Sequence, residues 1–527
     1  MNDRALSAQG ARWAIATPHW AATDAGAAAF EAGGNAVDAA VGAAVTLAAV
    51  YPHMCGVGGD LFALVASPDG SVTAVNGSGA APATADPDAL RQRSALMPEV
   101  GPATITVPGA ASGWAALAER GRLDLREAFG AAIAFAEDGI AVADDLAGSM
   151  AFRTEQLSED PGLRGVFLRD GQPLTEGDLL VQPALARTLK TLRDEGPAAL
   201  YGGDVGARYA SGLQAAGSPM TLDDLAAHSA EITEPLQGGF RDIEVLVTPP
   251  NSQGFVLLEM LAALQLLGVD PDPLGPDAAL MSELFRLASA DRDRYLADPR
   301  RAHVPVDTLL SEAHVRHLCE EAQTWTSTPG PLRRRPAASG DTVALVAADA
   351  EGNAISLVQS LYNGFGAGIL EPSTGMIAHN RGSLFSLDPA SPNLLEGGKR
   401  PFHTLTPVLA RRDGRLVAVS GSMGGGAQPQ INAQLLIRSF ELGMTPADAV
   451  AAPRWAVGGT EPDASLRFVE VETAVPGATC RALEEAGYAL DRLPEGDGVG
   501  HAHMIRVLED GFEVATDPRA DGSARAG

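Results

Sequence analysis

Apolar and polar positions along the chain form blocks whose periods predict both helices and strands. Residues 21–49 are rich in Ala and helical in character, and a Gly-Gly pair interrupts them. Residues 61–77 hold two apolar runs around a Pro-Asp-Gly sequence at 68–70, which predicts a β-hairpin because Pro and Gly suit successive turn positions. Residues 110–235 are mostly amphipathic and predict helices, one of them capped by Thr221.

The pattern changes along the second half of the chain. A strand is expected at 241–248, followed by helices through 255–300. Beyond these lie four runs typical of strands and two typical of helices: strands at 343–349, 353–361, 416–422 and 503–509, and helices at 432–442 and 480–487. Because strands occur in both halves, we expect one α+β layered sandwich rather than two independent domains.

Composition limits the class of protein and its partners. The chain has 527 residues, of which 46% are hydrophobic, so it can bury a large core. Its net charge of −28 argues against nucleic acids and anionic membranes as partners. The three cysteines, Cys55, Cys319 and Cys480, are too far apart for a disulfide framework or a metal motif. With no signal-peptide pattern and no apolar run of membrane-spanning length, we expect a cytoplasmic protein.

Two local motifs invite chemical interpretations. The Gly-rich stretch at 421–426 lacks the Lys and the spacing of a nucleotide-binding loop. It is either a tight turn between a strand and a helix or a loop that presents N–H groups to an oxyanion, and both can hold together. His501 and His503 could share one face of a strand and bind a metal. With no third ligand nearby, we interpret them as half-buried polar residues and expect no metal.

A lone Thr starts a strand in an unusual setting. Residues 328–340 are rich in Pro, Arg and small residues, and the strand pattern begins after Asp341 at Thr342. A hydroxyl is a poor nucleophile unless a base lies beside it, but a Thr at a chain N-terminus has its own α-amine, with a pKa of about 8. Thr342 is therefore either an ordinary strand residue or a nucleophile created by cleavage of the Asp341–Thr342 bond.

Six ordered segments, from about residue 14 to about residue 507, carry a family resemblance. They are residues 33–62, 180–203, 220–254, 341–369, 399–409 and 421–434. In these segments the chain resembles the γ-glutamyltransferase family of self-cleaving N-terminal-nucleophile hydrolases. The resemblance implies a four-layer αββα sandwich. It also implies a precursor cut into a large piece, 1–341, and a small piece, 342–527, that remain together as one intertwined domain. A homodimer of this two-piece unit is a further arrangement the resemblance allows.

The resemblance assigns the catalytic residues by position. Thr342 matches the nucleophile and new N-terminus, and Ser360 matches a second hydroxyl, usually Thr, that bonds to it. Gly424 and Gly425 match the pair whose N–H groups stabilise the oxyanion. No metal or organic cofactor is implied. The residues after the nucleophile depart from the family's Thr-His, because Val and Ala stand there. An uncleaved, non-catalytic binding protein is therefore an alternative.

The positions that hold the substrate in true γ-glutamyltransferases have all changed. Ser78 or a neighbour stands where the family has Arg, and His403-Thr404 replace a Ser-Ser pair. Ser383 stands at about the position of an amine-binding Asp, and Tyr362 at that of an Asn. The pattern is closer to the branch with oxamate amidohydrolases and cephalosporin acylases. A true γ-glutamyltransferase acting on glutathione is the alternative.

Arg381 lies in the loop that carries the amine-binding Asp in the family. A guanidinium there favours an anion and repels an ammonium group. We expect Arg381, with His403 and Thr404, to bind the carboxylate of a small acidic amide without an α-amine, such as oxamate or a glutaryl amide. The alternative is that Arg381 pairs with one of the chain's own acidic residues.

Overall fold

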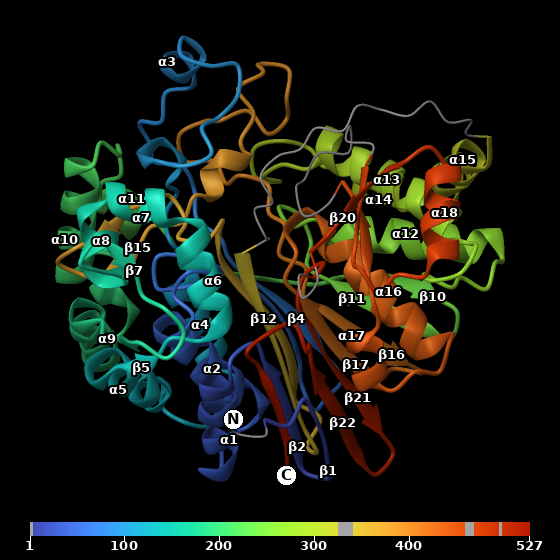
Figure 1. The fold of residues 1–527 in the computed structure, drawn as a ribbon, viewed down its shortest axis with the longest axis horizontal. Coiled ribbons are helices and arrows are strands. Elements are labelled where there is room, and N and C mark those ends of the chain that lie inside the picture. The colour runs from blue at the N-terminus through green and yellow to red at the C-terminus, as the bar shows by residue number, and fades with distance from the viewer. Residues whose placement is uncertain (1–3, 325–340, 459–467, 495–497) are drawn as a thin grey trace.

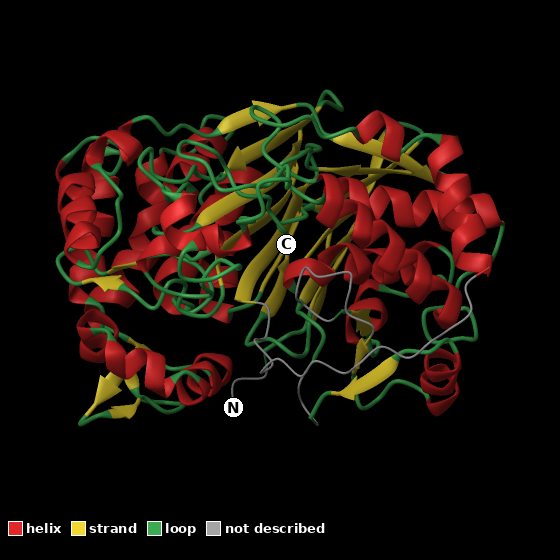
Figure 2. Ribbon diagram, turned by 90° about the horizontal axis from the view of Figure 1, so that it is seen from above, coloured by secondary structure: helices red, strands yellow, loops and turns green. Residues whose placement is uncertain are grey.

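Two sheets lie face to face at the centre of the molecule, and helices cover the outer face of each (Figures 1 and 2). The computed structural model describes residues 4–324, 341–458, 468–494 and 498–527. This arrangement confirms the predicted α+β class and the four-layer αββα sandwich. The predicted Pro- and Arg-rich segment at 328–340 lies outside the described residues.

The first sheet has seven antiparallel strands in the order β23-β2-β12-β13-β3-β4-β9. In that order the strands are Ser523–Ala526, Trp13–Thr17, Asp341–Asp349, Ala354–Tyr362, Asp60–Ala66, Val72–Gly77 and Glu231–Thr233. The predicted hairpin is confirmed as β3 and β4. The strand that begins at Asp341 lies near the middle of this sheet, between β2 and β13.

The second sheet is also seven-stranded and antiparallel, in the order β1-β22-β21-β17-β16-β11-β10. Its strands are Ser7–Gly10, Gly511–Thr516, Ala502–Leu508, Arg415–Ser422, Val408–Arg412, Ile243–Val247 and Leu236–Phe240. Between the two sheets lies an apolar layer that includes Leu64, Val346, Leu409, Val419 and Ile505. Inward-facing side chains from both sheets form such a layer when two sheets pack face to face.

Helices α1, α2, α4, α5 and α9 lie on the side of the first sheet (Figure 1). They span Trp20–Glu31, Ala36–Val50, Ala110–Ala118, Gly130–Asp138 and Pro183–Glu195. All residues of α2 are buried, as expected for a helix that is apolar all round. Its N-terminus is fixed by a capping box, in which Asn35 accepts from the Asp38 N–H and Asp38 accepts from the Asn35 N–H.

Helices α12, α13, α15, α16, α17 and α18 cover the second sheet (Figure 1). They span Gly254–Leu267, Ala278–Tyr295, Glu312–Thr324, Gln428–Phe440, Pro446–Ala451 and Gly477–Glu485. The other α-helices of the described residues are α3 Pro87–Arg91, α6 Asp144–Phe152, α7 Thr154–Glu159, α8 Pro161–Phe167, α10 Asp204–Ala215, α11 Leu222–Ala226 and α14 Val306–Leu309. The predicted cap of α11 by Thr221 is confirmed, since its hydroxyl accepts from the Asp224 N–H at 3.1 Å.

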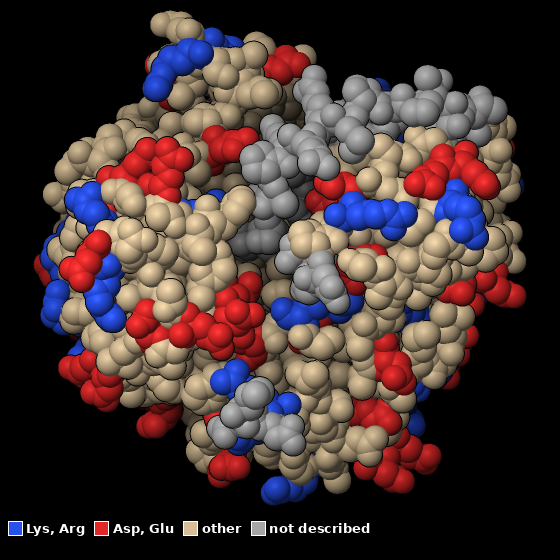
Figure 3. All heavy atoms as spheres, in the orientation of Figure 1, with Lys and Arg blue, Asp and Glu red and all other residues tan. Residues whose placement is uncertain are grey.

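Smaller sheets complete the fold. Their strands are β5 Ile140–Ala141 with β8 Leu179–Leu180, β6 Leu168–Arg169 with β7 Gln172–Pro173, β14 Leu370–Glu371 with β15 Met376–Ile377, and β18 Trp455–Val457, β19 Phe468–Val471 and β20 Ala489–Arg492. No helix among the described residues combines the length and apolar character needed to cross a bilayer. On the face in Figure 3, acidic side chains gather in several patches and basic ones form no continuous surface, in keeping with the net charge of −28.

The prediction of a half-buried histidine pair is wrong. His501 is 8% exposed and His503 is 0% exposed, and only His503 belongs to β21. Both are buried because β21 is an inner strand, paired with β17 and β22 and covered by α17. The His503 ring lies 3.0 Å from the Thr516 hydroxyl.

Candidate functional site

Thr342 lies beside Ser360 at the start of β12. Its Oγ1 is 2.9 Å from the Ser360 Oγ on β13, and Thr342 is 2% exposed. The register between the strands shifts here, because Asp341 pairs with Tyr362 whereas Val343 pairs with Gln359. Such irregularities redirect a side chain relative to the regular ladder. The structure thus brings together the two hydroxyls that the sequence analysis paired.

The Ser360 hydroxyl is itself held in place by the backbone. Its Oγ accepts a hydrogen bond from the Tyr362 N–H at 2.8 Å. This bond occupies one acceptor position, so the hydroxyl proton can point towards Thr342 and the Thr342 oxygen can accept it. Ser360 can therefore orient the Thr342 hydroxyl and stabilise negative charge on its oxygen.

The Gly-rich stretch forms the turn between β17 and α16. Gly424 has φ +131° and Gly425 has φ +51°, conformations that favour glycine. The Gly424 carbonyl accepts from the Ala427 N–H at 2.8 Å, so the planar peptide directs the Gly425 N–H the opposite way. Within the described part of the chain, neither the Gly424 nor the Gly425 N–H donates to the backbone. The interpretation as a turn between a strand and a helix is confirmed, and two adjacent N–H groups of this turn have no backbone acceptor among the described residues.

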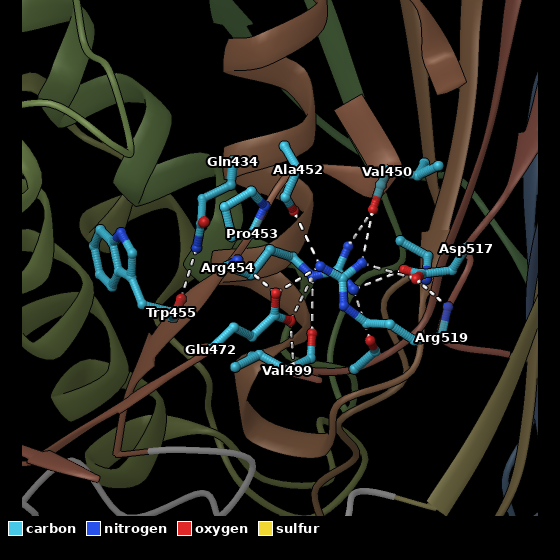
Figure 4. A network of polar contacts seen from close by, with 12 residues as sticks. Gln434, Val450, Ala452, Pro453, Arg454, Trp455, Glu472, Val499, Asp517 and Arg519 are labelled. Carbon is cyan, nitrogen blue, oxygen red and sulfur yellow. Dashed lines mark hydrogen bonds and ion pairs between the residues drawn. The ribbon is translucent and has the colours of Figure 1, made fainter. Parts of the chain in front are cut away.

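The Gly-rich turn rests on a segment held by a buried ion-pair network (Figure 4). The Met423 N–H, one residue before Gly424, donates to the His501 carbonyl at 2.8 Å. The residues next to His501 are fixed by Arg454, which donates to the Val499 carbonyl at 2.9 Å and the Gly500 carbonyl at 2.7 Å. The network thus supports the backbone against which the turn lies.

Two acids and two arginines complete this network. Arg454 and Arg519 both pair with Asp517, at 2.6 and 2.9 Å, and Arg519 also pairs with Glu472 at 2.5 Å. Burial by itself would raise the pKa of the Asp517 carboxyl, but the charges of Arg454 and Arg519 hold it well below its usual range. Asp517 also accepts from the Ala502 N–H at 2.8 Å, so the network ties the start of β21 in place.

Arg381 is buried next to the hydroxyl site with part of its guanidinium unused. It is 0% exposed, and its Nη1 donates to the Thr404 hydroxyl at 3.0 Å. Its Nε and Nη2 have no hydrogen-bond partner, and it makes no ion pair with any described residue. Burial lowers the pKa of Arg381 to about 10, partly opposed by Asp60 and Tyr362, so it remains charged at neutral pH. Two donors of a buried cation are thus left for a ligand.

Tyr362 connects Arg381 with the hydroxyl pair. The Arg381 guanidinium lies over the Tyr362 ring, 4.4 Å from its centroid, a cation–π contact. Tyr362 has φ +78°, which is rare for a residue with a side chain. Because its N–H also donates to Ser360, the residue fixes the guanidinium relative to the nucleophile candidate.

A buried carboxylate that was not predicted, Asp60, lies beside these residues. Asp60 begins β3 opposite Ser360, and its Oδ2 lies 2.9 Å from the His403 Nε2 and 3.4 Å from the His379 Nδ1. Burial would raise the pKa of Asp60, but the two histidines hold it well below its usual range. Burial and the charge of Arg381 lower the pKa of His403 to about 3. The feature of the sequence that could have pointed to Asp60 is an acidic residue that follows Gly58-Gly59 and begins an otherwise apolar strand.

The remaining predicted binding residues differ in their placement. As described above, Thr404 accepts a hydrogen bond from Arg381, and His403 contacts Asp60. Ser78 is buried in an adjoining polar cluster, where its hydroxyl donates to Asn76 at 2.7 Å and accepts from Asn251 at 3.2 Å, and the Asn251 carbonyl accepts from the His403 N–H at 2.7 Å. Ser383 is half-buried in the short helix Arg381–Leu384.

The layered fold, with a hydroxyl residue at the start of a central strand, is that of the N-terminal-nucleophile hydrolases. The chain belongs to the gamma-glutamyltranspeptidase family, whose profile matches residues 22–527. It is 36% identical to the glutathione hydrolase-like YwrD proenzyme of Bacillus subtilis, over 98% of each chain. It is also 36% identical to the oxamate amidohydrolase proenzyme of Klebsiella pneumoniae, over 96% of this chain and 97% of the relative.

A solved structure also supports membership of this family. The cephalosporin acylase of Bacillus halodurans superposes with a TM-score of 0.91 at 30% identity, over 100% of this chain and 98% of the other. The predicted membership of the family and the predicted enzymatic class, an amidohydrolase, are confirmed.

Proposed function

We propose that this chain is a self-processing amidohydrolase that cuts its own Asp341–Thr342 bond and then uses Thr342 to cleave a small acidic amide. The 2.9 Å contact between the Thr342 and Ser360 hydroxyls supports the chemistry. The two unpartnered donors of buried Arg381 carry the assignment of the substrate class.

The cleavage step follows from the position of Thr342. Its Oγ attacks the carbonyl carbon of Asp341, and the C–N bond breaks as the Thr342 nitrogen takes up a proton. Water then hydrolyses the ester, which leaves a carboxylate at Asp341 and a free α-amine at Thr342. That amine, with a pKa of about 8, becomes a base beside its own hydroxyl.

Catalysis repeats the same chemistry on an external amide. The Thr342 α-amine accepts the hydroxyl proton while Oγ attacks the amide carbonyl. The N–H groups of Gly424 and Gly425 stabilise the oxyanion, each contributing about 3 kcal/mol in comparable sites. The amine leaves, and water resolves the acyl-Thr342 ester. The positive φ angles of Gly424 and Gly425, and the lack of a backbone acceptor for either N–H among the described residues, support this role.

The large piece 1–341 and the small piece 342–527 would stay together after the cut. Strands β12 and β13 of the small piece lie between β2 and β3 of the large piece in one sheet. Both sheets contain strands of both pieces, so separation would break backbone ladders and the shared core.

The substrate's carboxylate is assigned to Arg381. A buried guanidinium with free Nε and Nη2 groups presents two neighbouring donors, the geometry that binds a carboxylate in bidentate fashion. No acidic side chain among the described residues takes that place, which disfavours internal pairing of Arg381. A neighbouring cation also repels an ammonium group, so an amide without an α-amine fits better than a γ-glutamyl compound. Oxamate and glutaryl amides have this chemistry, and a Klebsiella relative is named for oxamate.

Processing is tested on the purified protein. Intact mass and N-terminal sequencing should show a small piece that begins at Thr342 and a large piece that ends at Asp341. A single chain of 54.2 kDa that never matures would overturn self-processing and favour the non-catalytic alternative.

The substrate class is tested with matched amides. Glutaryl-p-nitroanilide and γ-glutamyl-p-nitroanilide differ only in the α-amine, so the ratio of their kcat/KM values isolates its effect. We expect the glutaryl compound to be preferred, and oxamate to release ammonia. A tenfold preference for the γ-glutamyl compound would instead favour a true γ-glutamyltransferase.

A further inference from the structure

Glu259 is a buried acid on α12 that has no part in the chemistry proposed above. It lies on the inner side of α12 and is 0% exposed. Both of its carboxylate oxygens lack a hydrogen-bond partner. A buried ionised carboxylate without partners is strongly unfavourable, so this position requires a proton or a cation.

Two metal-ligating side chains meet Glu259 from neighbouring helices. His314, on α15, places its Nε2 3.8 Å from the Glu259 Oε1. The same nitrogen lies 2.7 Å from the Asp291 Oδ2 on α13. One donor atom from each of the three residues lies within 4.8 Å of the others. Asp291 and His314 are partly exposed, which leaves a path by which an ion can enter.

We propose that Glu259, Asp291 and His314 form a divalent metal site, with Zn²⁺ as the best-suited ion. One imidazole nitrogen and two carboxylate oxygens match zinc's ligand preferences. In a tetrahedral site with bonds of about 2.0 Å, donors lie about 3.3 Å apart, and the two measured separations bracket this value.

The three ligands come from three helices, so the ion would join α12, α13 and α15. Helix α15 ends at Thr324 and is the last described element before β12 begins at Asp341. An ion at this point would fasten the end of the large piece to the outer helical layer. We therefore assign the ion a structural role, in which it ties the three helices together.

The test measures zinc binding and thermal unfolding on the full chain. Metal-free protein is titrated with ZnCl₂ by calorimetry, and the bound zinc is counted after desalting. The variants are Glu259→Gln, which keeps the shape, and His314→Ala. The matched control is His317→Ala, which removes an exposed histidine from the same helix.

We expect one zinc per chain in the wild type and in His317→Ala, with a rise in Tm on binding. Glu259→Gln and His314→Ala should each bind at least tenfold more weakly and lose the zinc-dependent rise. No stoichiometric zinc in the wild type, or equal affinity in all four proteins, would overturn the site. Should Glu259→Gln fail to fold, the partly exposed His314 still provides the test.

Discussion

Two fully buried arginines, Arg454 and Arg381, have opposite surroundings. Arg454 donates to backbone carbonyls and pairs with Asp517, and none of its nitrogens is left unsatisfied. Arg381 has one hydrogen bond, to Thr404, and a ring beneath it, and two of its nitrogens are unsatisfied.

These surroundings indicate different roles for the two buried charges. A buried charge is costly unless hydrogen bonds and an opposite charge replace the lost water. Around Arg454 that compensation is built in, and the arginine braces the segment behind the Gly-rich turn. Around Arg381 no described residue supplies this compensation, as expected if a bound ligand supplies it. Changes at the two arginines should therefore separate stability from substrate binding.

The largest loss of activity should come from changing Thr342, the nucleophile proposed above. Thr342→Ala should leave the chain uncut and lower turnover at least about 10³-fold, because no other group can form the acyl ester. Its Tm should stay close to that of the wild type, since the Arg454 network is untouched. Gel mobility, turnover and calorimetry check this. Thr342→Ser, which keeps a hydroxyl, should still be cut, and an active alanine variant would refute the assignment.

Arg454→Ala should cause the largest loss of stability. It leaves Asp517 buried with one of its two arginine partners and removes a hydrogen-bond donor from three backbone carbonyls. Breaking comparable buried pairs costs about 3–5 kcal/mol. Urea unfolding measures the change in the free energy of unfolding. Arg415→Ala, an exposed position on β17, should change it by less than about 0.5 kcal/mol. Equal losses of stability in Arg454→Ala and Arg415→Ala would show that the buried network around Arg454 does not stabilise the fold.

Arg381→Met should weaken substrate binding and spare stability. The variant keeps most of the volume but removes the charge that would bind the carboxylate, so KM for an acidic amide should rise about 10²-fold, equivalent to about 3 kcal/mol. The free energy of unfolding should be unchanged or higher, because no internal ion pair is lost. Steady-state kinetics with urea unfolding tests both. An unchanged KM would remove Arg381 from the substrate site.

The last prediction concerns the pH dependence of stability that comes from two buried histidines, His403 near Arg381 and His503 near Arg454. Burial lowers the pKa of His403 and of His503 to about 3, whereas an unfolded histidine has a pKa of about 6.5. Between these values the unfolded chain binds more protons, so stability is fully present above pH 6.5 and falls as the pH drops towards 3. Each histidine contributes a slope of about 1.4 kcal/mol per pH unit. His503→Asn should reduce the measured slope by about that amount, and an unchanged slope would contradict a neutral buried His503.

Much of the fold follows from local pattern. The Pro-Asp-Gly turn predicted the β3–β4 hairpin, and Thr221 predicted the start of α11, because turn and cap geometry depend on a few adjacent residues. Long apolar runs likewise predicted β12 and β13. The histidine pair was misjudged because strand periodicity does not tell whether neighbouring strands and helices cover both faces.

The order of the elements, the family and the place of Thr342 at the start of a strand could all be read from the amino-acid sequence. Which buried charges are compensated became visible only in the folded molecule. Asp60 meets His403 across 343 residues of chain, and Arg381 and Glu259 are recognisable only by the partners they lack. The two kinds of feature differ in the length of chain on which they depend. Hydrogen bonds of turns and caps span a few residues, whereas the desolvation and pairing of a buried charge depend on every element packed around it.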